Sequence, residues 1–190
     1  MIVIGILAHF IYRPWQMNWG ATEQEILRAM PGDRVVGQSS FTATRAVTIK
    51  ASPEQIWPWL LQLGYKRAGF YSWDILDNDR IPSAENILPE FQHLEKGDRL
   101  PLSADSDAIV DILETNKHLA LIFLPDSLAT WVWGLYPTET GNTRMVTRLR
   151  VHTDSHMPQF LLEYFEIIMM RKHMLGIKRR AEAMRGFTGD

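Results

Sequence analysis

The chain contains no cysteine among its 190 residues. This absence excludes disulfide bonds, thiolate metal sites and a cysteine nucleophile. An excess of charge of either sign is also lacking, because 20 Lys and Arg residues are balanced by 22 Asp and Glu residues, with a formal net charge of -2. Such a chain has no overall positive field, and we therefore expect no nucleic-acid partner.

Several widespread catalytic motifs are missing as well. The chain has no GxSxG, HExxH, Walker-type glycine loop or GxGxxG, which counts against the main hydrolase, zinc-protease and nucleotide-binding classes. Asp74, Asp77 and Asp79 lie close together, but their spacing is not that of an EF-hand, so we interpret them as charges in a solvated loop. His152 and His156 are four residues apart, but Pro158 places them at a helix start rather than on one helical face, and we identify no third ligand for them. We therefore expect neither a metal site nor a cofactor.

An apolar run extends from Met1 to Tyr12. As a helix it would reach about 18 Å, short of the roughly 30 Å hydrocarbon core of a bilayer. It could pack on the protein, lie at a membrane surface, or end a longer membrane segment. We expect residues 1–20 to form an apolar segment ahead of one domain at 21–190. The expected location is the cytoplasm, with association with the inner face of the membrane as the alternative.

The end of the chain is basic. Six Lys or Arg residues and a single acid, Glu182, lie between Arg171 and Arg185. Cations at a helix C-terminus interact favourably with the helix dipole, so a solvated helix end explains them. Contact with anionic lipid headgroups is the alternative, and it would agree with an N-terminal membrane anchor.

Residues 52–64 carry the clearest helix signals. Ser52 offers an N-cap hydroxyl, Pro53 suits the first helical position, and Gln55 completes a capping box. Apolar residues then follow at helical spacing, which predicts a helix that buries Trp57 against the rest of the fold.

Alternating apolar and polar residues mark five strands. Short links separate the last four, which predicts an antiparallel meander because a parallel crossover needs about a dozen residues. A long amphipathic helix over 157–185 closes the chain, with a disturbance expected near Gly176. A sheet and a helix of this kind can bury each other's apolar faces, so we predict an α+β fold in which a curved antiparallel sheet wraps around the last helix. The expected strands are 41–50, 107–114, 118–124, 130–136 and 144–151, and a short helix is expected at 22–30.

Two tryptophans identify the apolar face of this sheet. Trp131 and Trp133 lie two residues apart in an expected strand, so both face the same side. The last helix offers Tyr164, Phe165 and Met169 to that side. These side chains could fill a solid core or line a cavity, and both interpretations stay open.

Three arginines lie on the opposite parity of the last expected strand. Arg144, Arg148 and Arg150 should therefore face solvent if the apolar side faces inward. An arginine turned into a cavity instead would be an anchor for a carboxylate or an enolate.

With these elements in place, residues 40–185 resemble the helix-grip superfamily, often written SRPBCC, of START-type lipid-transfer domains, plant pathogenesis-related allergens and bacterial polyketide cyclases. TRAVTI at 44–49 followed by SPEQIWPWL at 52–60 is similar to the first strand and helix of many bacterial members. GFYSWD at 69–74 and LEKGD at 94–98 are similar to a bacterial subgroup. The resemblance implies about seven antiparallel strands wrapped around the C-terminal helix, with an apolar cavity between them. It transfers no catalytic residue.

We therefore expect this chain to bind a hydrophobic small molecule, such as a lipid, an isoprenoid or a polyketide-like compound, in a cavity of about 300–1,000 Å³. One alternative is a cyclase- or dehydratase-type enzyme. In it, Asp74 near the cavity entrance or a buried histidine would move protons, and Tyr71 or an inward-facing arginine would polarise a carbonyl. A membrane-tethered interaction domain is another. An ionisable residue in the cavity would favour the enzyme, whereas a wholly apolar lining would favour the binding protein, which we prefer. The expected lining residues are Tyr71, Trp73, Trp131, Trp133, Tyr164, Phe165 and Met169.

Overall fold

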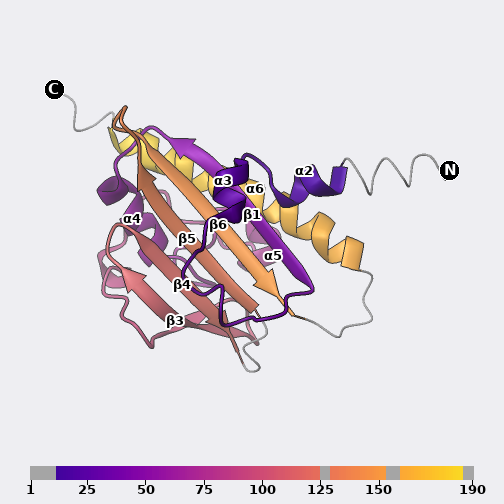
Figure 1. Cartoon of the computed structure of the whole chain (residues 1–190). Helices are drawn as coiled ribbons and strands as arrows, with labels where there is room; N and C mark the ends of the chain where they lie inside the picture. Colours follow the sequence, from indigo (N-terminus) through magenta and orange to yellow (C-terminus); the bar gives the residue numbers. More distant parts are fainter. Residues whose placement is uncertain (1–11, 125–128, 153–158, 186–190) are drawn as a thin grey trace.

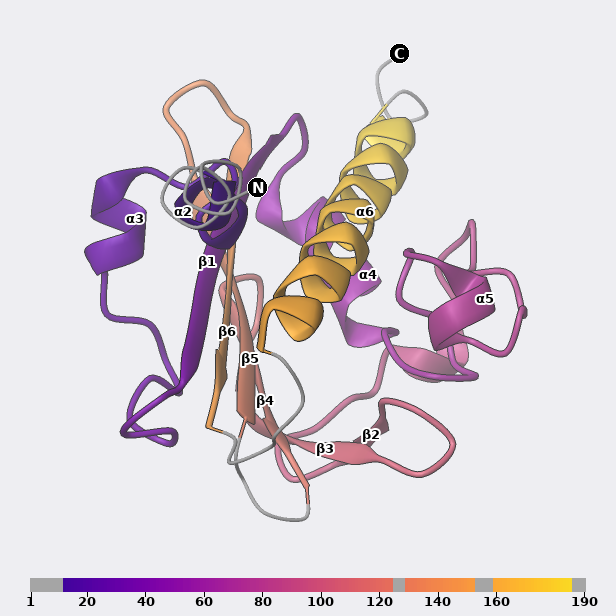
Figure 2. The ribbon, with the colours of Figure 1, turned by 90° about the vertical axis from the view of Figure 1, so that its right-hand side faces the viewer.

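The computed structural model describes residues 12–124, 129–152 and 159–185, with side chains described throughout except at 159–166 and 185. Its centre is an antiparallel sheet with strand order β1-β6-β5-β4-β3-β2. Helix α6 crosses one face of this sheet with α4 beside it, and α3 lies on the other face (Figures 1 and 2). The strands are β1 (Phe41–Ile49), β2 (Arg99–Pro101), β3 (Asp107–Glu114), β4 (His118–Phe123), β5 (Ala129–Pro137) and β6 (Thr143–Val151). The helices are α2 (Arg13–Met17), α3 (Glu23–Leu27), α4 (Pro53–Leu61), α5 (Asp74–Asp77), the 3-10 turn η2 (Pro89–Phe91) and α6 (Gln159–Arg185).

The predicted α+β helix-grip architecture is confirmed, but the number of strands is not. The described residues form six strands rather than about seven. The region between α4 and β2 holds no further strand. It contains left-handed backbone at Lys66, Tyr71, Asp79 and Arg80, and such residues cannot continue an extended run. Among the described residues, no helix combines the length and the hydrophobicity needed to cross a bilayer.

Helix α4 forms as its capping signals predict. The backbone N–H of Ser52 donates to Oε1 of Gln55 at 3.0 Å, which is the side-chain half of a capping box. Trp57 is 5% exposed, and Glu54 points to solvent. The predicted helix at 22–30 is shorter in the structure, where α3 ends at Leu27.

Helix α6 is continuous through Gly176, so the disturbance expected there does not occur. The glycine has a packing role instead. A Cβ at this position would overlap the backbone carbonyl oxygen of Tyr71, because the loop after α4 runs directly against the helix. Gly in a helix costs roughly 1 kcal/mol relative to Ala, and here it permits the close approach of loop and helix.

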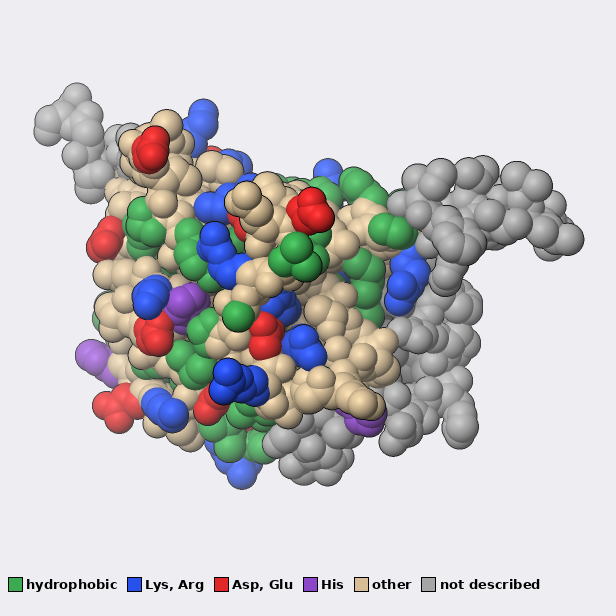
Figure 3. Space-filling view, viewed as in Figure 1, with side chains coloured by type: hydrophobic (Ala, Val, Ile, Leu, Met, Phe, Trp, Pro, Cys, Tyr) green, Lys and Arg blue, Asp and Glu red, His purple; other side chains and the backbone are tan. Residues whose placement is uncertain are grey.

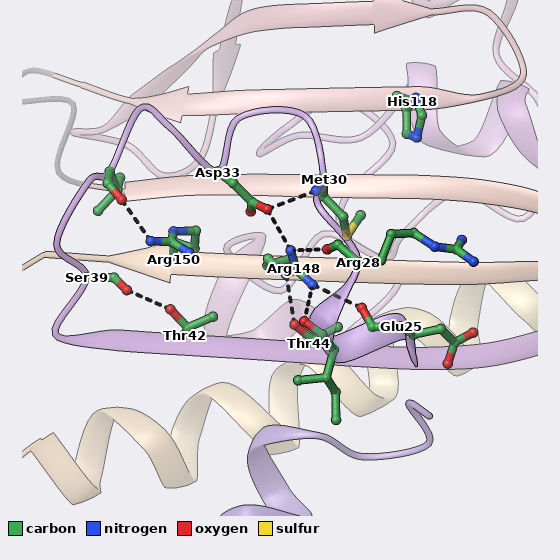
Figure 4. Close-up of polar contacts among 12 residues, drawn as sticks. Glu25, Arg28, Met30, Asp33, Ser39, Thr42, Thr44, His118, Arg148 and Arg150 are labelled. Carbon is green, nitrogen blue, oxygen red and sulfur yellow. Dashed lines mark hydrogen bonds and ion pairs between the residues drawn. The ribbon is translucent and has the colours of Figure 1, made fainter. Parts of the chain in front are cut away.

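The expectation that Arg144, Arg148 and Arg150 face solvent is wrong for Arg148, which is only 4% exposed. All three side chains bond to the segment at 22–37, so they point away from α6, as parity predicts. This segment covers the outer face of the sheet (Figure 2), and Figure 4 shows Arg148 and Arg150 beneath it. Strand periodicity shows which way a side chain points, and it does not show what covers it. The guanidinium of Arg148 donates five hydrogen bonds, to Oγ1 of Thr44, Oδ2 of Asp33 and the carbonyl oxygens of Glu25, Ile26 and Arg28.

The chain before α3 lies along strand β1. The backbone N–H of Ala46 donates to the carbonyl oxygen of Trp19 at 3.1 Å, and Nε of Arg45 donates to the carbonyl oxygen of Gln16 at 3.0 Å. Gly20 follows with φ +72°, and a Cβ there would overlap the Ala46 carbonyl oxygen. Glycine is therefore required at this contact by both conformation and space.

Candidate functional site

A cavity of about 220 Å³ lies between α6 and the inner face of the sheet. It is smaller than the predicted range, and most of its wall is apolar. The lining residues come from β4, β5, α6, the loop after α4, helix α5 and the turn after β2; they are Phe70, Ser72, Asp77, Leu102, Phe123, Trp131, Met169, Met170 and His173.

Trp131 forms one wall of the cavity. Its indole Nε1 donates to Oγ1 of Thr147 on the neighbouring strand at 2.9 Å, and its ring stacks on Phe70 with centroids 6.3 Å apart. The hydrogen bond and the stacking fix the ring, so the apolar wall is formed before any ligand arrives. Met169 and Met170 lie opposite on α6, and the flexible thioether side chain of Met adapts to different apolar shapes.

His173 lines the same cavity, but both of its ring nitrogens are already bonded. Nε2 accepts from the indole N–H of Trp133 at 3.0 Å. Nδ1 lies 2.6 Å from the carbonyl oxygen of Phe70 and donates to it, because a carbonyl can only accept. Burial lowers the pKa of His173 to about 4. The ring is therefore neutral near pH 7, and its bonding positions it as a structural group.

Asp77 is the other ionisable residue in the lining. Its Oδ1 is buried and has no hydrogen-bond partner among the described residues. Burial raises the pKa of the Asp77 carboxyl to about 6, and the nearby charge of Asp74 adds to the rise, while Ser72 and Lys172 oppose it. Asp77 thus contradicts the interpretation of 74–79 as a fully solvated acidic loop, although Asp79 is exposed as expected.

The structure brings two of the predicted lining residues, Trp131 and Met169, to the cavity wall. Trp133 is fully buried and does not line the cavity. The centroid of its ring lies 4.1 Å from the centroid of the Trp131 ring. Trp73 is 42% exposed, with the ammonium of Lys172 3.7 Å from the centre of its ring. The side chains of Tyr164 and Phe165, two more of the predicted residues, lie outside the described part of the chain.

Tyr71 and Asp74 line a neighbouring polar cleft of about 370 Å³. The Tyr71 hydroxyl donates to the carbonyl oxygen of Trp59 and accepts from Nε2 of Gln62. Burial raises the pKa of Tyr71 above its ordinary value of 10.0, so the phenol stays protonated at neutral pH. The Asp74 carboxylate accepts from the Ser83 hydroxyl. Both weak catalytic candidates therefore have partners within the protein and lie away from the apolar cavity.

Sequence reasoning missed His173, Ser72 and Phe70, and it assigned Asp77 to a solvated loop. His173 lies four residues after Met169, which is one helical turn, so the spacing could have placed both on one face. Asp77 offered no such signal, because α5 has only four residues and too little length to show a period. In the described residues, no group of three or more His, Asp or Glu side chains is arranged to hold a metal ion.

The basic end of α6 is largely engaged within the protein. Arg179 and Arg180 both bind Glu85, and Lys178 binds Glu182 at 2.8 Å. On the face shown in Figure 3, charges of both signs are interspersed. Contact of this helix end and of the segment from Met1 to Tyr12 with a membrane stays a prediction, because the first eleven residues lie outside the described part.

The comparisons with known proteins identify the fold. No protein-family model and no curated protein matches the chain. Among solved structures, a START superfamily protein from Mycobacterium smegmatis is similar over 75% of this chain and 98% of its own, with a TM-score of 0.51 and 12% identity. The Aha1 dimer from Colwellia psychrerythraea is similar over 75% of this chain and 96% of its own, with a TM-score of 0.51 and 17% identity. At such identities the likeness shows the fold alone, a helix-grip fold shared with START-like proteins.

Proposed function

We propose that this chain binds a compact hydrophobic molecule in the cavity between α6 and the sheet. The observation that carries the proposal is the largely apolar cavity, walled by the fixed ring of Trp131 and the adaptable side chain of Met169. Binding sites for small molecules are mainly apolar and carry a few placed polar groups. The START-like fold supports this function, because the superfamily commonly binds hydrophobic ligands in this position.

The cavity volume favours ligands of one or two rings, or a short isoprenoid, over a long acyl chain. A dry cavity of about 150 Å³ already accepts benzene. The present cavity, at about 220 Å³, exceeds that volume by less than the space that a second benzene molecule would need. Among the ligands expected from the sequence, small aromatic polyketide-like compounds therefore fit better than extended lipids.

Naphthalene tests the binding function in equilibrium dialysis against purified protein. Saturable binding by the wild type is expected. Met169→Trp should weaken it by about tenfold or more, because the larger side chain occupies the cavity. The matched control is Ile168→Trp, since Ile168 is the neighbouring residue on α6 and is 54% exposed. Equal affinity of both variants, or no binding by the wild type, would contradict the proposal.

A second function, proton transfer on the bound molecule, is favoured by one observation, the presence of the Asp77 carboxyl in the cavity. A carboxyl with a pKa of about 6 is well placed for general acid–base work near neutral pH. Mass spectrometry of compounds that co-purify with wild type and Asp77→Asn separates the two functions. A carrier gives the same compound from both proteins, whereas an enzyme of the dehydratase kind gives a compound heavier by one water from the variant.

A further inference from the structure

We propose that the polar cleft between α6 and the loop after α4 binds a phosphate monoester through Lys172, Arg179 and Arg180. Only Ser72 lines both this cleft and the apolar cavity, so the inference goes beyond the proposed binding of a hydrophobic molecule. It depends on a guanidinium fixed in the cleft wall, on donors that the protein leaves available, and on a carboxylate that occupies the position of a ligand.

The cations of the cleft share one face of α6. The helix side of the cleft consists of Lys172, Leu175, Gly176, Arg179 and Arg180. Spacings of three and four residues relate them, which places them on one face of the helix. The opposite wall belongs to the loop after α4, which lies alongside α6 (Figure 2) and contributes Tyr71, Ser72, Asp74, Ser83 and Glu85. The volume of about 370 Å³ lies within the range of about 300–1,000 Å³ for small-molecule sites.

Arg180 supplies a cation that is fixed before a ligand arrives. Its side chain is only 7% exposed. Nε donates to the carbonyl oxygen of Ala84 at 2.7 Å, and Nη1 donates to the carbonyl oxygen of Gly176 at 3.2 Å. The guanidinium also lies 4.5 Å from the centre of the Tyr71 ring. These neutral partners hold the group in place and leave its charge to be balanced by an anion in the cleft.

Lys172 and Arg179 bring donors that the protein does not use. The ammonium of Lys172 lies over the Trp73 ring and makes no hydrogen bond or ion pair with the described residues. Arg179 bonds to the described residues only through Nη2, so its Nε and Nη1 are available. A phosphate group has three oxygens that accept strong hydrogen bonds, and both an ammonium and a guanidinium suit it. Both cations can therefore bind a phosphate without losing a bond to another part of the cleft wall.

Glu85 occupies the position that we assign to the phosphate. Its carboxylate accepts from Nη2 of Arg179 at 2.6 and 2.8 Å and from Nη2 of Arg180 at 2.7 Å, although its side chain is 58% exposed. One negative charge thus serves two adjacent guanidinium groups. A phosphate monoester carries a charge of about −1.5 to −2 near pH 7, so it balances both groups better. Exposed ion pairs are weak, which allows Glu85 to give way to the ligand.

The charge of the whole wall favours the same class of ligand. Asp74 is the remaining acid of the cleft, and its carboxylate accepts from the Ser83 hydroxyl. The described wall therefore carries three positive and two negative side chains, and its net charge is positive. Burial lowers the pKa of the Arg180 guanidinium, the charge of Glu85 opposes this change, and the charge of Arg179 adds to it. A doubly charged anion relieves this repulsion more than a singly charged one.

Isothermal titration calorimetry with glycerol 2-phosphate tests the site, at low salt because salt screens exposed charges. The wild type should bind this probe saturably, and dimethyl phosphate, which carries a single charge, should bind about tenfold or more weakly. Lys172→Met should weaken the binding of glycerol 2-phosphate about fivefold or more. The matched control is Arg171→Met, which removes the same charge from the neighbouring position on α6, outside the cleft lining. It should change the affinity by less than about twofold.

Vesicles of phosphatidylcholine with and without phosphatidic acid, whose headgroup is a phosphate monoester, distinguish the source of the phosphate. Sedimentation with the acidic vesicles that Lys172→Met abolishes would assign the cleft to a lipid headgroup. Binding of glycerol 2-phosphate without such sedimentation would assign it to a soluble ligand.

Glu85→Gln gives the sharpest test, because it removes the competing carboxylate and should tighten the binding of glycerol 2-phosphate about threefold or more. Its control is Glu90→Gln, which removes an exposed acid outside the cleft. Naphthalene should bind all of these variants as it binds the wild type, so failure of the phosphate site would leave the proposed function standing. The inference would be overturned if neither wild type nor Glu85→Gln binds the probe saturably, if Glu85→Gln binds it no more tightly than Glu90→Gln, or if Lys172→Met and Arg171→Met weaken it equally.

Discussion

The bonding of His173 leads to a prediction about stability and pH. The ring is 1% exposed, and burial lowers its pKa from the ordinary 6.5 to about 4. Above pH 6.5 the imidazole is neutral in both the folded and the unfolded chain, so it adds no pH dependence. Below that value the unfolded chain binds a proton that the folded chain does not, and the free energy of unfolding falls as the pH decreases toward about 4. The difference in pKa corresponds to about 3 kcal/mol in total.

His173→Gln is the variant that isolates this effect. The Gln side chain offers an N–H donor for the Phe70 carbonyl and a carbonyl acceptor for the Trp133 indole, and it does not titrate. Urea unfolding of both proteins, followed by circular dichroism across this pH range, gives the difference in unfolding free energy. The variant should gain up to about 3 kcal/mol on the wild type as the pH falls from about 7.5 to about 4. All other titrating groups, Asp77 among them, are common to both proteins and cancel in the difference. Parallel pH curves would show that His173 keeps its ordinary pKa in the fold.

Three further predictions concern packing. Trp57→Ala should lower the unfolding free energy by about 3–5 kcal/mol in urea unfolding, because α4 buries Trp57 in the core. The exposed control Leu27→Ala should lie near wild type, and a similar loss in both variants would contradict the assignment. Gly176→Ala should lower the thermal midpoint, because the new methyl group overlaps the Tyr71 backbone; a higher midpoint would mean that helix propensity outweighs this contact. Arg148→Met should cost about 3–5 kcal/mol and make the segment at 22–37 sensitive to limited proteolysis, whereas a protease-resistant variant would show that other contacts hold the segment.

The meander could be predicted almost to the residue. Strand β3 spans Asp107–Glu114, as its alternation predicts, and β4 to β6 differ from the predicted bounds by one residue at each shifted end. Period-two patterns and short turns are local signals, so they can be recognised in the sequence without knowledge of the tertiary structure. The same parity placed Trp131 on the inner face and Arg148 on the outer one.

The rest of the site depended on tertiary contacts. The side chains of Phe70, Ser72 and Asp77 reach the cavity because the loop after α4 turns back against α6, with Tyr71 in left-handed backbone at φ +57°. A tyrosine gives no local signal for that conformation. The burial of Arg148 was equally hidden, since its five acceptors lie far away in sequence or belong to the backbone.

The position of residues 16–20 beside β1 has a consequence for how molecules of this protein meet in solution. An open antiparallel sheet has two outer strands whose free backbone groups can pair with a second molecule, which leads to aggregation. At one side the outer strand is β2, which has only three residues and ends at Pro101. At the other it is β1, with nine residues, and there the chain around Trp19 and Gly20 already occupies part of the border. We expect residues 16–20 to hinder self-association, because they cover backbone groups on the outer side of β1. Without them, more of the outer side of β1 would be available for pairing with a second copy of the protein.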